Sequence, residues 1–475
     1  MTEMAYRTNT TIYIGFFDLE KAFDKVSRYK LLKKLVAMGI GRCMFEAIKK
    51  LYLCTYCVLG FGKEFSTEFQ TFSGIRQGAS SSALFFIAFI DGLFDYLTDR
   101  CPNEVLLENM LHCLLHADDT AILRTNRDLF IDKCNHMLDY FELNDLSLNL
   151  EKSGYLIING SDDERVNLEL KNGVLEYHSI MKYLGVKISD NGNLKRDIEL
   201  HIEDKRANVT IKFGNFCRKN FLAPLEVKLH VLNVCVSASL LYSCETWCGS
   251  NFKSIEVLYR QGLKTALGVR KCVNNEIVYT ECDEYPLKIR IMKQQLKFWL
   301  SLNEYLQDNP QHYLNTLIDK AKDYPYITYY KNLQQTYTDT KMCDKTLKEE
   351  LKAKRKDTIE NAARLDENSK LGSYLQVNPT LEKPIYDNKL EFQRVCVTRY
   401  RTGSHNLAVE KGRFGGTLRD DRLCSCYTGI QTVKHVVTEC PLLADAREQF
   451  GVVDLVNGVM NDAYLLEMEK VLAVK

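Results

Sequence analysis

The chain has 475 residues, which at about 100–200 residues per domain predicts two to four domains. Its 63 basic and 62 acidic side chains give a formal net charge of +1, which excludes a uniformly basic protein but not local basic patches. With 45% apolar and 26% charged residues, the composition is that of a folded globular chain and not of a disordered one.

The cysteines and the apolar runs exclude two further classes. The 17 cysteines are odd in number and follow no framework spacing, so we expect reduced thiols in an intracellular protein. No signal peptide pattern opens the chain. The longest fully apolar run, Ala83–Ile90, is too short to cross a bilayer, so no membrane partner is expected.

The first part of the chain alternates strand and helix patterns. Ile12–Asp18 is a short apolar run ending in a carboxylate, which predicts a buried strand. Ser27 is the expected cap of a helix that stops at Gly39. Cys57–Thr71 predicts paired strands, and Ser80–Leu97 predicts one apolar helix.

The pattern continues with a hairpin and further strands. Leu111–Leu123 consists of two short apolar runs around Ala-Asp-Asp, which predicts a hairpin with two carboxylates at its tip. Asp128–Asn144 has helical periodicity, and Leu146–Asn159 and Leu168–Ile188 are predicted as strands.

The rest of the chain is predicted to be mainly helical. Leu194–Arg218 and Leu225–Leu241 carry apolar residues every three or four positions, and Lys341–Leu371 has the mixed charge of a solvated helix. We place a domain boundary near Gly372–Pro384. Beyond it, Arg394–Arg422 holds seven basic and three acidic residues, a local net charge of +4.

Three carboxylates lie at predicted strand ends. Asp18 ends the first strand, and Asp118 and Asp119 occupy the hairpin tip. Carboxylates from separate elements can converge on Mg²⁺, which prefers oxygen ligands, and two such ions can clamp a phosphoryl transfer. An Asp-Asp pair alone is weak evidence, because most such pairs are ordinary loop residues.

Five short segments follow one another over the first 190 residues. In order they are FFDLEKAFD at Phe16–Asp24, SGIRQGAS at Ser73–Ser80, HADD at His116–Asp119, LNLEKS at Leu148–Ser153 and YLGV at Tyr183–Val186. They resemble motifs A, B, C, D and E of reverse transcriptases. The residues of these motifs and their order along the chain are most similar to those of non-LTR (LINE-type) retrotransposon reverse transcriptases. Each motif alone is weak evidence, but the match of all five in order is strong.

The resemblance implies an α+β fold: a right-hand polymerase palm with a mixed or antiparallel sheet and helices, then a helical thumb, a helical connector and a small Cys/His zinc-type tail. We expect the palm at 1–190, the thumb at 191–270, the connector at 271–384 and a basic C-terminal tail at 385–475. In the family a long fingers region and an endonuclease precede motif A, which here begins at Phe16. We therefore expect an N-terminally truncated chain with impaired polymerisation.

The resemblance also implies a role for individual residues. The predicted ligands of two Mg²⁺ ions are Asp18, Asp118 and Asp119. The other implied positions are Phe23 as the steric gate under the nucleotide sugar, Gln77 and Gly78 at the nucleotide and template, Lys152 near the triphosphate, and Tyr183, Leu184 and Gly185 as the primer grip.

Each of these positions also has a structural reading. Phe23 can be a core residue and Lys152 an ordinary surface lysine. Gln77 and Gly78 fit a loop-to-helix turn, and the Tyr183 segment fits a buried strand. One departure stands in motif C itself, where His116 occupies the position of the family's Phe or Tyr and marks either a lineage variant or a decayed copy.

The tail contains a Cys/His cluster. Cys424, Cys426, His435 and Cys440 offer three thiolates and one imidazole within a short segment, a ligand set that suits a tetrahedral structural Zn²⁺. The first pair is tighter than the usual C-x2-C, and the alternative is a set of reduced structural cysteines. With zinc, the tail would bind RNA or DNA through the +4 segment.

The leading hypothesis is an RNA-directed DNA polymerase that acts on template RNA, a DNA primer or target DNA, and deoxynucleoside triphosphates, in the cytoplasm and nucleus. The second is a catalytically inactive retrotransposon remnant that only binds nucleic acid. An RNA-dependent RNA polymerase shares the palm but fits Phe23 poorly, because a bulky side chain there would clash with a ribose 2′-OH.

Overall fold

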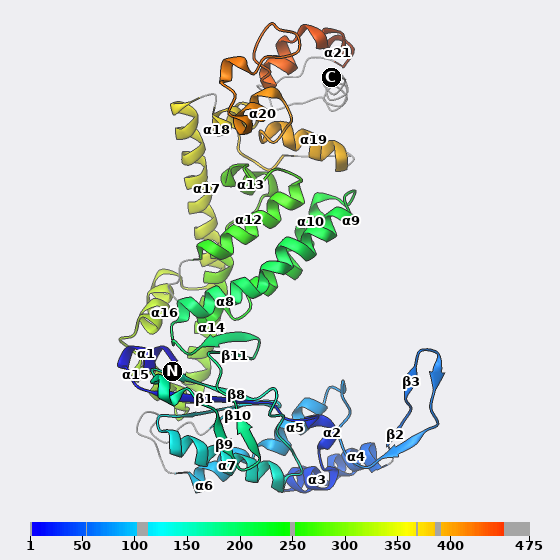
Figure 1. The fold of residues 1–475 in the computed structure, drawn as a ribbon, viewed down its shortest axis with the longest axis vertical. Coiled ribbons are helices and arrows are strands. Elements are labelled where there is room, and N and C mark those ends of the chain that lie inside the picture. The colour runs from blue at the N-terminus through cyan, green and yellow to red at the C-terminus, as the bar shows by residue number, and fades with distance from the viewer. Residues whose placement is uncertain are drawn as a thin grey trace. The chain divides into compact units, whose positions relative to one another are not determined.

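The computed structural model describes residues 2–53, 55–101, 113–247, 252–366, 369–384 and 391–450 (Figure 1). The chain divides into two compact units, Met1–Ile198 with Gln311–Leu317 (unit 1) and Glu199–Pro310 with Ile318–Lys475 (unit 2). None of the helices in the described ranges combines the length and apolarity that a membrane crossing requires.

Unit 1 mixes helices with antiparallel strands. Its helices are α1 Thr2–Thr8, α2 Ala22–Lys25, α3 Arg28–Ala37, α4 Arg42–Leu53, α5 Ser82–Ile90, α6 Leu93–Arg100 and α7 Arg127–Leu143. Its strands are β1 Ile12–Phe17, β2 Thr55–Cys57, β3 Gly60–Phe61, β4 Glu64–Phe65, β5 Phe69–Thr71, β6 Leu114–His116, β7 Asp119–Arg124, β8 Gly154–Ile158, β9 Leu168–Leu170, β10 Gly173–Leu175, β11 Ile180–Tyr183 and β12 Val186–Ser189.

The central sheet has four antiparallel strands in the order β6-β7-β1-β8. All six residues of β1 are buried because both faces of the sheet are covered. Tyr13 and Phe17 face a core shared with Phe130 of α7. Ile14 and Phe16 face the opposite core, to which Ala5 of α1 and the β11–β12 hairpin contribute. The predicted buried strand at Ile12–Asp18 is confirmed.

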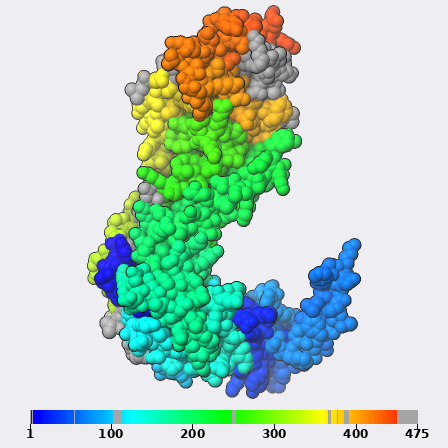
Figure 2. Space-filling view, in the orientation of Figure 1, coloured from blue at the N-terminus to red at the C-terminus, as the bar shows by residue number. Residues whose placement is uncertain are grey.

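A β-arm built from two strand pairs, β2 with β5 and β3 with β4, extends from unit 1 (Figures 1 and 2). The paired strands predicted at Cys57–Thr71 are therefore confirmed. The arm exposes large apolar side chains on its surface, including Phe61, Phe65 and Phe72.

Two sequence predictions in unit 1 need correction. The helix expected at Ser80–Leu97 is two helices, α5 and α6, and the Tyr140 hydroxyl donates to the carbonyl of Ile90 at the break between them. The strand expected at Leu146–Asn159 is confined to β8. Its first half is a turn, in which the Ser153 amide donates to the carbonyls of Asn149 (3.0 Å) and Leu150 (3.2 Å).

Unit 2 is mainly helical, as predicted. Its main helices are α9 Gly214–Lys219, α10 Leu225–Val231, α11 Ala238–Leu240, α12 Lys253–Leu267, α13 Asn275–Cys282, α14 Leu287–Asp308, α16 Pro325–Thr336, α17 Thr340–Leu365, α18 Lys370–Val377, α19 Glu391–Arg401, α20 Ala408–Gly415 and α21 Ala444–Phe450. Two further helices each cross a boundary between the units: α8 Leu194–Ala207 and α15 Tyr313–Lys320. The helices predicted at 194–218 and 225–241 are each interrupted by a π-helical segment, Asn208–Phe213 and Leu232–Ser237.

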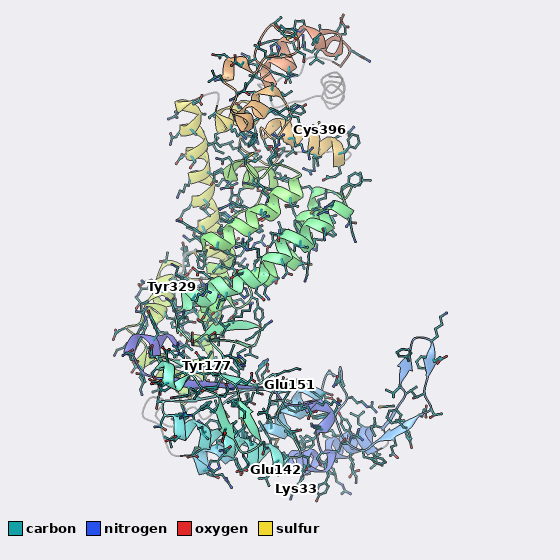
Figure 3. All side chains as sticks on the ribbon, in the orientation of Figure 1. Lys33, Glu142, Glu151, Tyr177, Tyr329 and Cys396 are labelled. Atoms are coloured by element: carbon teal, nitrogen blue, oxygen red, sulfur yellow. The ribbon has the colours of Figure 1, made fainter. Side chains whose placement is uncertain are left out.

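Helix α19, which carries Cys396 (Figure 3), is held to the preceding helices of unit 2 by buried ion pairs. Glu391 accepts from Lys228 of α10 and from Arg394, each at 2.7 Å. Arg401 forms a two-pronged pair with Glu281 of α13, whose side chain is fully buried. Two of the seven basic residues in Arg394–Arg422 are thus structural and do not face solvent.

Candidate functional site

The end of β1 and the start of β7 bring predicted ligands together. Phe17 at the end of β1 pairs with Thr120 of the antiparallel strand β7. Asp18, the next residue after β1, therefore lies beside Asp119, the first residue of β7. His116 pairs with Asp119 across the β6–β7 hairpin, which leaves Ala117 and Asp118 as its two-residue tip, with Ala117 in the left-handed region (φ 54°). The hairpin predicted around Ala-Asp-Asp is confirmed over the described part of Leu111–Leu123. All three aspartates are half-buried.

Electrostatic repulsion acts between these carboxylates. Burial raises the pKa of Asp119, and the negative charges of Asp118 and Asp18 raise it further. Three carboxylate side chains at the rim of a sheet form an oxygen-only ligand set, which suits Mg²⁺. The carboxylate oxygens of the three aspartates do not form a close group of possible metal ligands. Among the described residues, such a group, with its ligand atoms within 4.8 Å of one another, is found in the Cys/His cluster. The like charges favour binding of a cation.

Motifs A and B are joined by hydrogen bonds. The Gln77 side-chain amide donates to the Asp24 carboxylate at 3.2 Å, and the Ile75 amide donates to the Phe23 carbonyl at 2.9 Å. Asp24 was not expected to have a role, and no signal in one sequence separates it from a solvated acid. Its carboxylate accepts this one hydrogen bond from the Gln77 side chain.

Phe23 is half-buried and stacks on Phe86, with ring centroids 5.1 Å apart. Gln77 and Gly78 are exposed. Gly78 has φ +84°, and a Cβ built on it would meet no atom within 4 Å, so open space lies beside its backbone. These positions are compatible with contact to a nucleotide, and their individual roles stay predictions.

Motif D lies against the end of motif A. The Asp18 amide donates to the Ser153 hydroxyl at 3.1 Å, and the Asn149 amide donates to the Asp18 carbonyl at 2.8 Å. The Lys152 ammonium lies 3.7 Å from the Asp18 carboxylate, although its side chain is 70% exposed. The turn that replaces the expected strand therefore positions both Asp18 and a cation beside it.

Motif E forms the β11–β12 hairpin, in which Tyr183 pairs with Val186. Leu184 and Gly185 form its tip, both with positive φ (46° and 80°), as two-residue hairpins with type I′ turns require. The Tyr183 ring packs on Phe16 at 5.1 Å, and burial together with the charge of Asp119 raises the pKa of Tyr183 to about 12. Motif E thus lies beside the carboxylates in unit 1.

The Cys/His cluster is closed. The ligand atoms of Cys424, Cys426, His435 and Cys440 all lie within 4.8 Å of one another. The sulfurs of Cys424 and Cys440 are 3.7 Å apart, close to the ~3.8 Å that tetrahedral coordination at a Zn–S distance of about 2.3 Å requires. The Cys426 sulfur is 3.2 Å from the His435 Nε2 atom.

A neighbouring carboxylate supports this ligand set. His435 Nδ1 lies 3.5 Å from the Glu439 carboxylate, an arrangement that orients metal-binding imidazoles. Partial burial raises the pKa of the Cys426 thiol, but hydrogen bonds with Thr428, and then His435, outweigh it and bring the pKa down to about 6. These observations fit a metal with sulfur and nitrogen ligands.

Comparison with known proteins agrees with the arrangement in unit 1. Residues 2–188 match the family described as reverse transcriptase (RNA-dependent DNA polymerase). The chain is 28% identical over 145 residues to a retrovirus-related Pol polyprotein from the type-1 retrotransposable element R2 of Popillia japonica, covering 30% of this chain and 24% of that protein. It is 24% identical over 193 residues to the transposon TX1 uncharacterized 149 kDa protein of Xenopus laevis, covering 40% and 14%.

Solved structures give a weaker likeness. Apo telomerase from Candida tropicalis is 13% identical, with a TM-score of 0.33 and coverage of 56% of this chain and 44% of that one. Telomerase from Candida albicans in complex with a telomeric RNA fragment is 12% identical, with a TM-score of 0.24 and coverage of 64% and 51%. Scores this low carry no further conclusion about the fold.

Residues 2–188 therefore form a reverse transcriptase domain. Over 145 and 193 residues the chain is distantly homologous to the R2 and TX1 non-LTR retrotransposon proteins, and it spans about a quarter or less of the length of these two relatives. The reverse transcriptase domain expected from the five motifs is confirmed.

Two glycines in motif B provide a matched test of the contact between motifs A and B. Gly74 has φ +82°, and a Cβ there would lie 2.8 Å from the Asp24 carbonyl oxygen, whereas Gly78 has the same backbone strain and open space. Gly78→Ala is expected to lower the free energy of unfolding by about 1–2 kcal/mol, and Gly74→Ala by a further ~1–3 kcal/mol from the clash. Equal losses of unfolding free energy for the two variants, measured by urea unfolding, would contradict the close contact between Gly74 and Asp24.

Asp119→Asn tests the repulsion between the carboxylates. A raised pKa means that the folded chain holds this proton more tightly than the unfolded chain, so stability falls as the pH rises through the carboxylate range. Without divalent cations, the variant is expected to unfold on the order of a degree higher than the parent at neutral pH, and at the same temperature in strong acid. Exposed Asp163→Asn is the control, and a lower midpoint for Asp119→Asn at neutral pH would contradict the repulsion.

Proposed function

We propose that this chain is an RNA-directed DNA polymerase of a non-LTR retrotransposon, which extends a DNA 3′-OH by copying an RNA template. The observation that carries the proposal is the placement of Asp18 and Asp119 on neighbouring strands, with Asp118 at the hairpin tip and Lys152 3.7 Å from Asp18. The match of residues 2–188 to the reverse transcriptase family supports it.

In the proposed reaction the 3′-oxygen forms a bond to the α-phosphorus of a deoxynucleoside triphosphate, and pyrophosphate leaves. Two Mg²⁺ ions held by Asp18, Asp118 and Asp119 would stabilise the charge on the attacking and leaving oxygens. Lys152 offers a positive charge beside Asp18, where the triphosphate would neighbour the ligand set. In this proposal the metal ligands and the counter-charge would lie on one rim of the sheet.

The remaining roles follow from the neighbourhood of that rim. Phe23 is proposed as the steric gate against a 2′-OH, and Gln77, held by Asp24, and Gly78 as contacts of nucleotide and template. Tyr183, Leu184 and Gly185 are proposed as the primer grip, supported by the proximity of Tyr183 to Asp119. His116 lies on the same hairpin as the aspartates and stays without an assigned role.

We extend the proposal to the domains. Residues 1–190 would be the palm, 191–270 the thumb, 271–384 the connector and 385–475 the tail, which the helical character of unit 2 supports. Such an enzyme would be translated in the cytoplasm and would use chromosomal DNA in the nucleus.

The Cys/His cluster is proposed as a structural Zn²⁺ site. One zinc per chain is expected in metal analysis under reducing conditions, because four ligand atoms already surround one position. Cys440→Ser is expected to lose the zinc. Cys396→Ser is the control, since Cys396 is buried in the same core without belonging to the cluster (Figure 3). Full zinc content in Cys440→Ser, or none in the parent, would contradict the site.

Primer extension on an RNA template with Mg²⁺ tests the polymerase. Removing one ligand with Asp118→Ala is expected to reduce synthesis by more than about 100-fold, because even indirect partners of metal ligands contribute about 10–100-fold. Asp163→Ala, which removes an exposed carboxylate of the same unit, should leave synthesis unchanged. If the parent chain binds RNA but makes no cDNA, the binding-remnant hypothesis holds and the polymerase proposal is wrong.

A further inference from the structure

A polar hollow lies in unit 2, outside the sites described above. Its cavity of about 280 Å³ is lined by the loop after α12, residues 268–270, and by Arg399 together with residues 404–406. A second hollow of about 410 Å³ shares Arg270 with the first and adds Lys411 and Phe414 of α20. Volumes of several hundred Å³ are typical of small-ligand sites, and the shared arginine makes the two hollows neighbours. We call them together the basic hollow.

Hydrogen bonds across the two segments fix the walls of the basic hollow. The Arg270 amide donates to the Ser404 hydroxyl at 2.8 Å, and the Arg270 guanidinium donates to the Asn406 side chain at 2.5 Å. The Arg399 Nε donates to the Gly268 carbonyl at 2.8 Å. Each guanidinium carries five donors, and these bonds orient the arginines without occupying all of them.

Five of the seven basic residues in Arg394–Arg422 have partners within the fold. Arg394 pairs with Glu391, Arg401 with Glu281, and Arg413 with Glu410. Arg422 donates to the carbonyls of Thr417 and Val409, and Arg399 donates to that of Gly268. Arg399, Lys411 and Arg419 are exposed and pair with no carboxylate in the described part of the chain. Two of these three line the basic hollow.

Among the residues that the structure describes, no acidic side chain lines either cavity. The nearby Glu410 carboxylate is paired with Lys370 at 2.9 Å and with Arg413 at 2.7 Å. The pKa of His405 is lowered to about 3, mainly by burial. The positive charges of Lys370, Arg270 and Arg413 lower this pKa further, which shows that the electrostatic potential around the imidazole is positive. The imidazole is therefore neutral at physiological pH, and the field around it is positive.

An aromatic ring lies beside these cations. Phe414 is 62% exposed, and the Arg270 guanidinium carbon lies 5.6 Å from its ring centroid. An exposed ring next to a row of cations is the arrangement by which proteins bind unpaired nucleic acid strands, with bases stacked on the ring and phosphates near the cations. An acidic peptide would use the cations but would leave the ring without a partner.

We propose that the basic hollow binds an unpaired nucleic acid strand, with phosphates at Arg270, Arg399 and Lys411 and a base stacked on Phe414. This inference rests on the proposed function in one respect, since the enzyme would present its template or target as a single strand. The sequence predicted nucleic-acid binding through the whole segment Arg394–Arg422, whereas this proposal assigns binding to the part of that segment that lines the basic hollow.

Binding is tested on the full chain carrying Asp118→Asn, so that no synthesis occurs. The probes are a fluorescent oligouridylate, an oligothymidylate and a DNA duplex, measured by anisotropy over a range of salt concentrations. Phe414→Ala is expected to weaken single-strand binding by about 5- to 150-fold, the loss of one stacked base. Arg399→Gln and Lys411→Gln are each expected to reduce the salt dependence by about 0.7 in log K against log salt.

Arg419→Gln is the matched control, because it removes one exposed charge of the same segment outside the hollow. It should leave the salt slope and the affinity near those of the parent, and circular dichroism melting should show that all variants fold. The two single-stranded probes decide between RNA and DNA as the ligand. If Phe414→Ala and Arg399→Gln bind both probes as Arg419→Gln does, the proposal is wrong.

A second measurement separates this proposal from the polymerase. A 4-thiouridine-containing RNA should crosslink to the peptide that contains Phe414, and a crosslink confined to other peptides would overturn the site. A parent chain that crosslinks at Phe414 but extends no primer would support the basic hollow while contradicting the polymerase.

Discussion

Strand β1 pairs with β7 on one side and with β8 on the other, and helices and hairpins cover both of its faces. This double pairing fixes the register in which Phe17 lies opposite Thr120, and with it the position of Asp18 beside Asp119. A slip by one residue would turn Phe16 and Phe17 to the wrong cores, so the apolar side chains on the two faces hold the carboxylates in place. The grouping of these carboxylates is thus a consequence of packing, although they repel one another.

The sequence allowed a correct prediction wherever the determining contacts are local. The apolar run at Ile12–Asp18, the cap at Ser27 and the hairpin around Ala-Asp-Asp each depend on neighbours in the chain, and each agrees with the structure. The turn at Asn149–Ser153 was expected to be a strand. Leu146, Leu148 and Leu150 alternate as in a strand. However, Asn149 and Ser153 bond to the backbone of distant Asp18, which periodicity does not reveal.

Charge was harder to predict than secondary structure. Counting residues in Arg394–Arg422 gave a basic segment, yet the partners of Arg394 and Arg401 lie outside that window, at Glu391 and at Glu281. Glu281 is more than a hundred positions away in the chain, so no window of sequence could cancel its charge against Arg401. The Cys/His cluster was easier, because its four candidate ligands lie close in sequence. A turn spans the tight first pair, with the Tyr427 amide donating to the Cys424 carbonyl at 2.9 Å.

The buried ion pairs of α19 have a consequence for copies that end early. A chain that stopped before Glu391 would leave Lys228 and Glu281 without their counter-ions, and a charge that stays buried without its partner is strongly destabilising. Loss of residues 391–475 would therefore destabilise α10 and α13, the helices that carry these two charges.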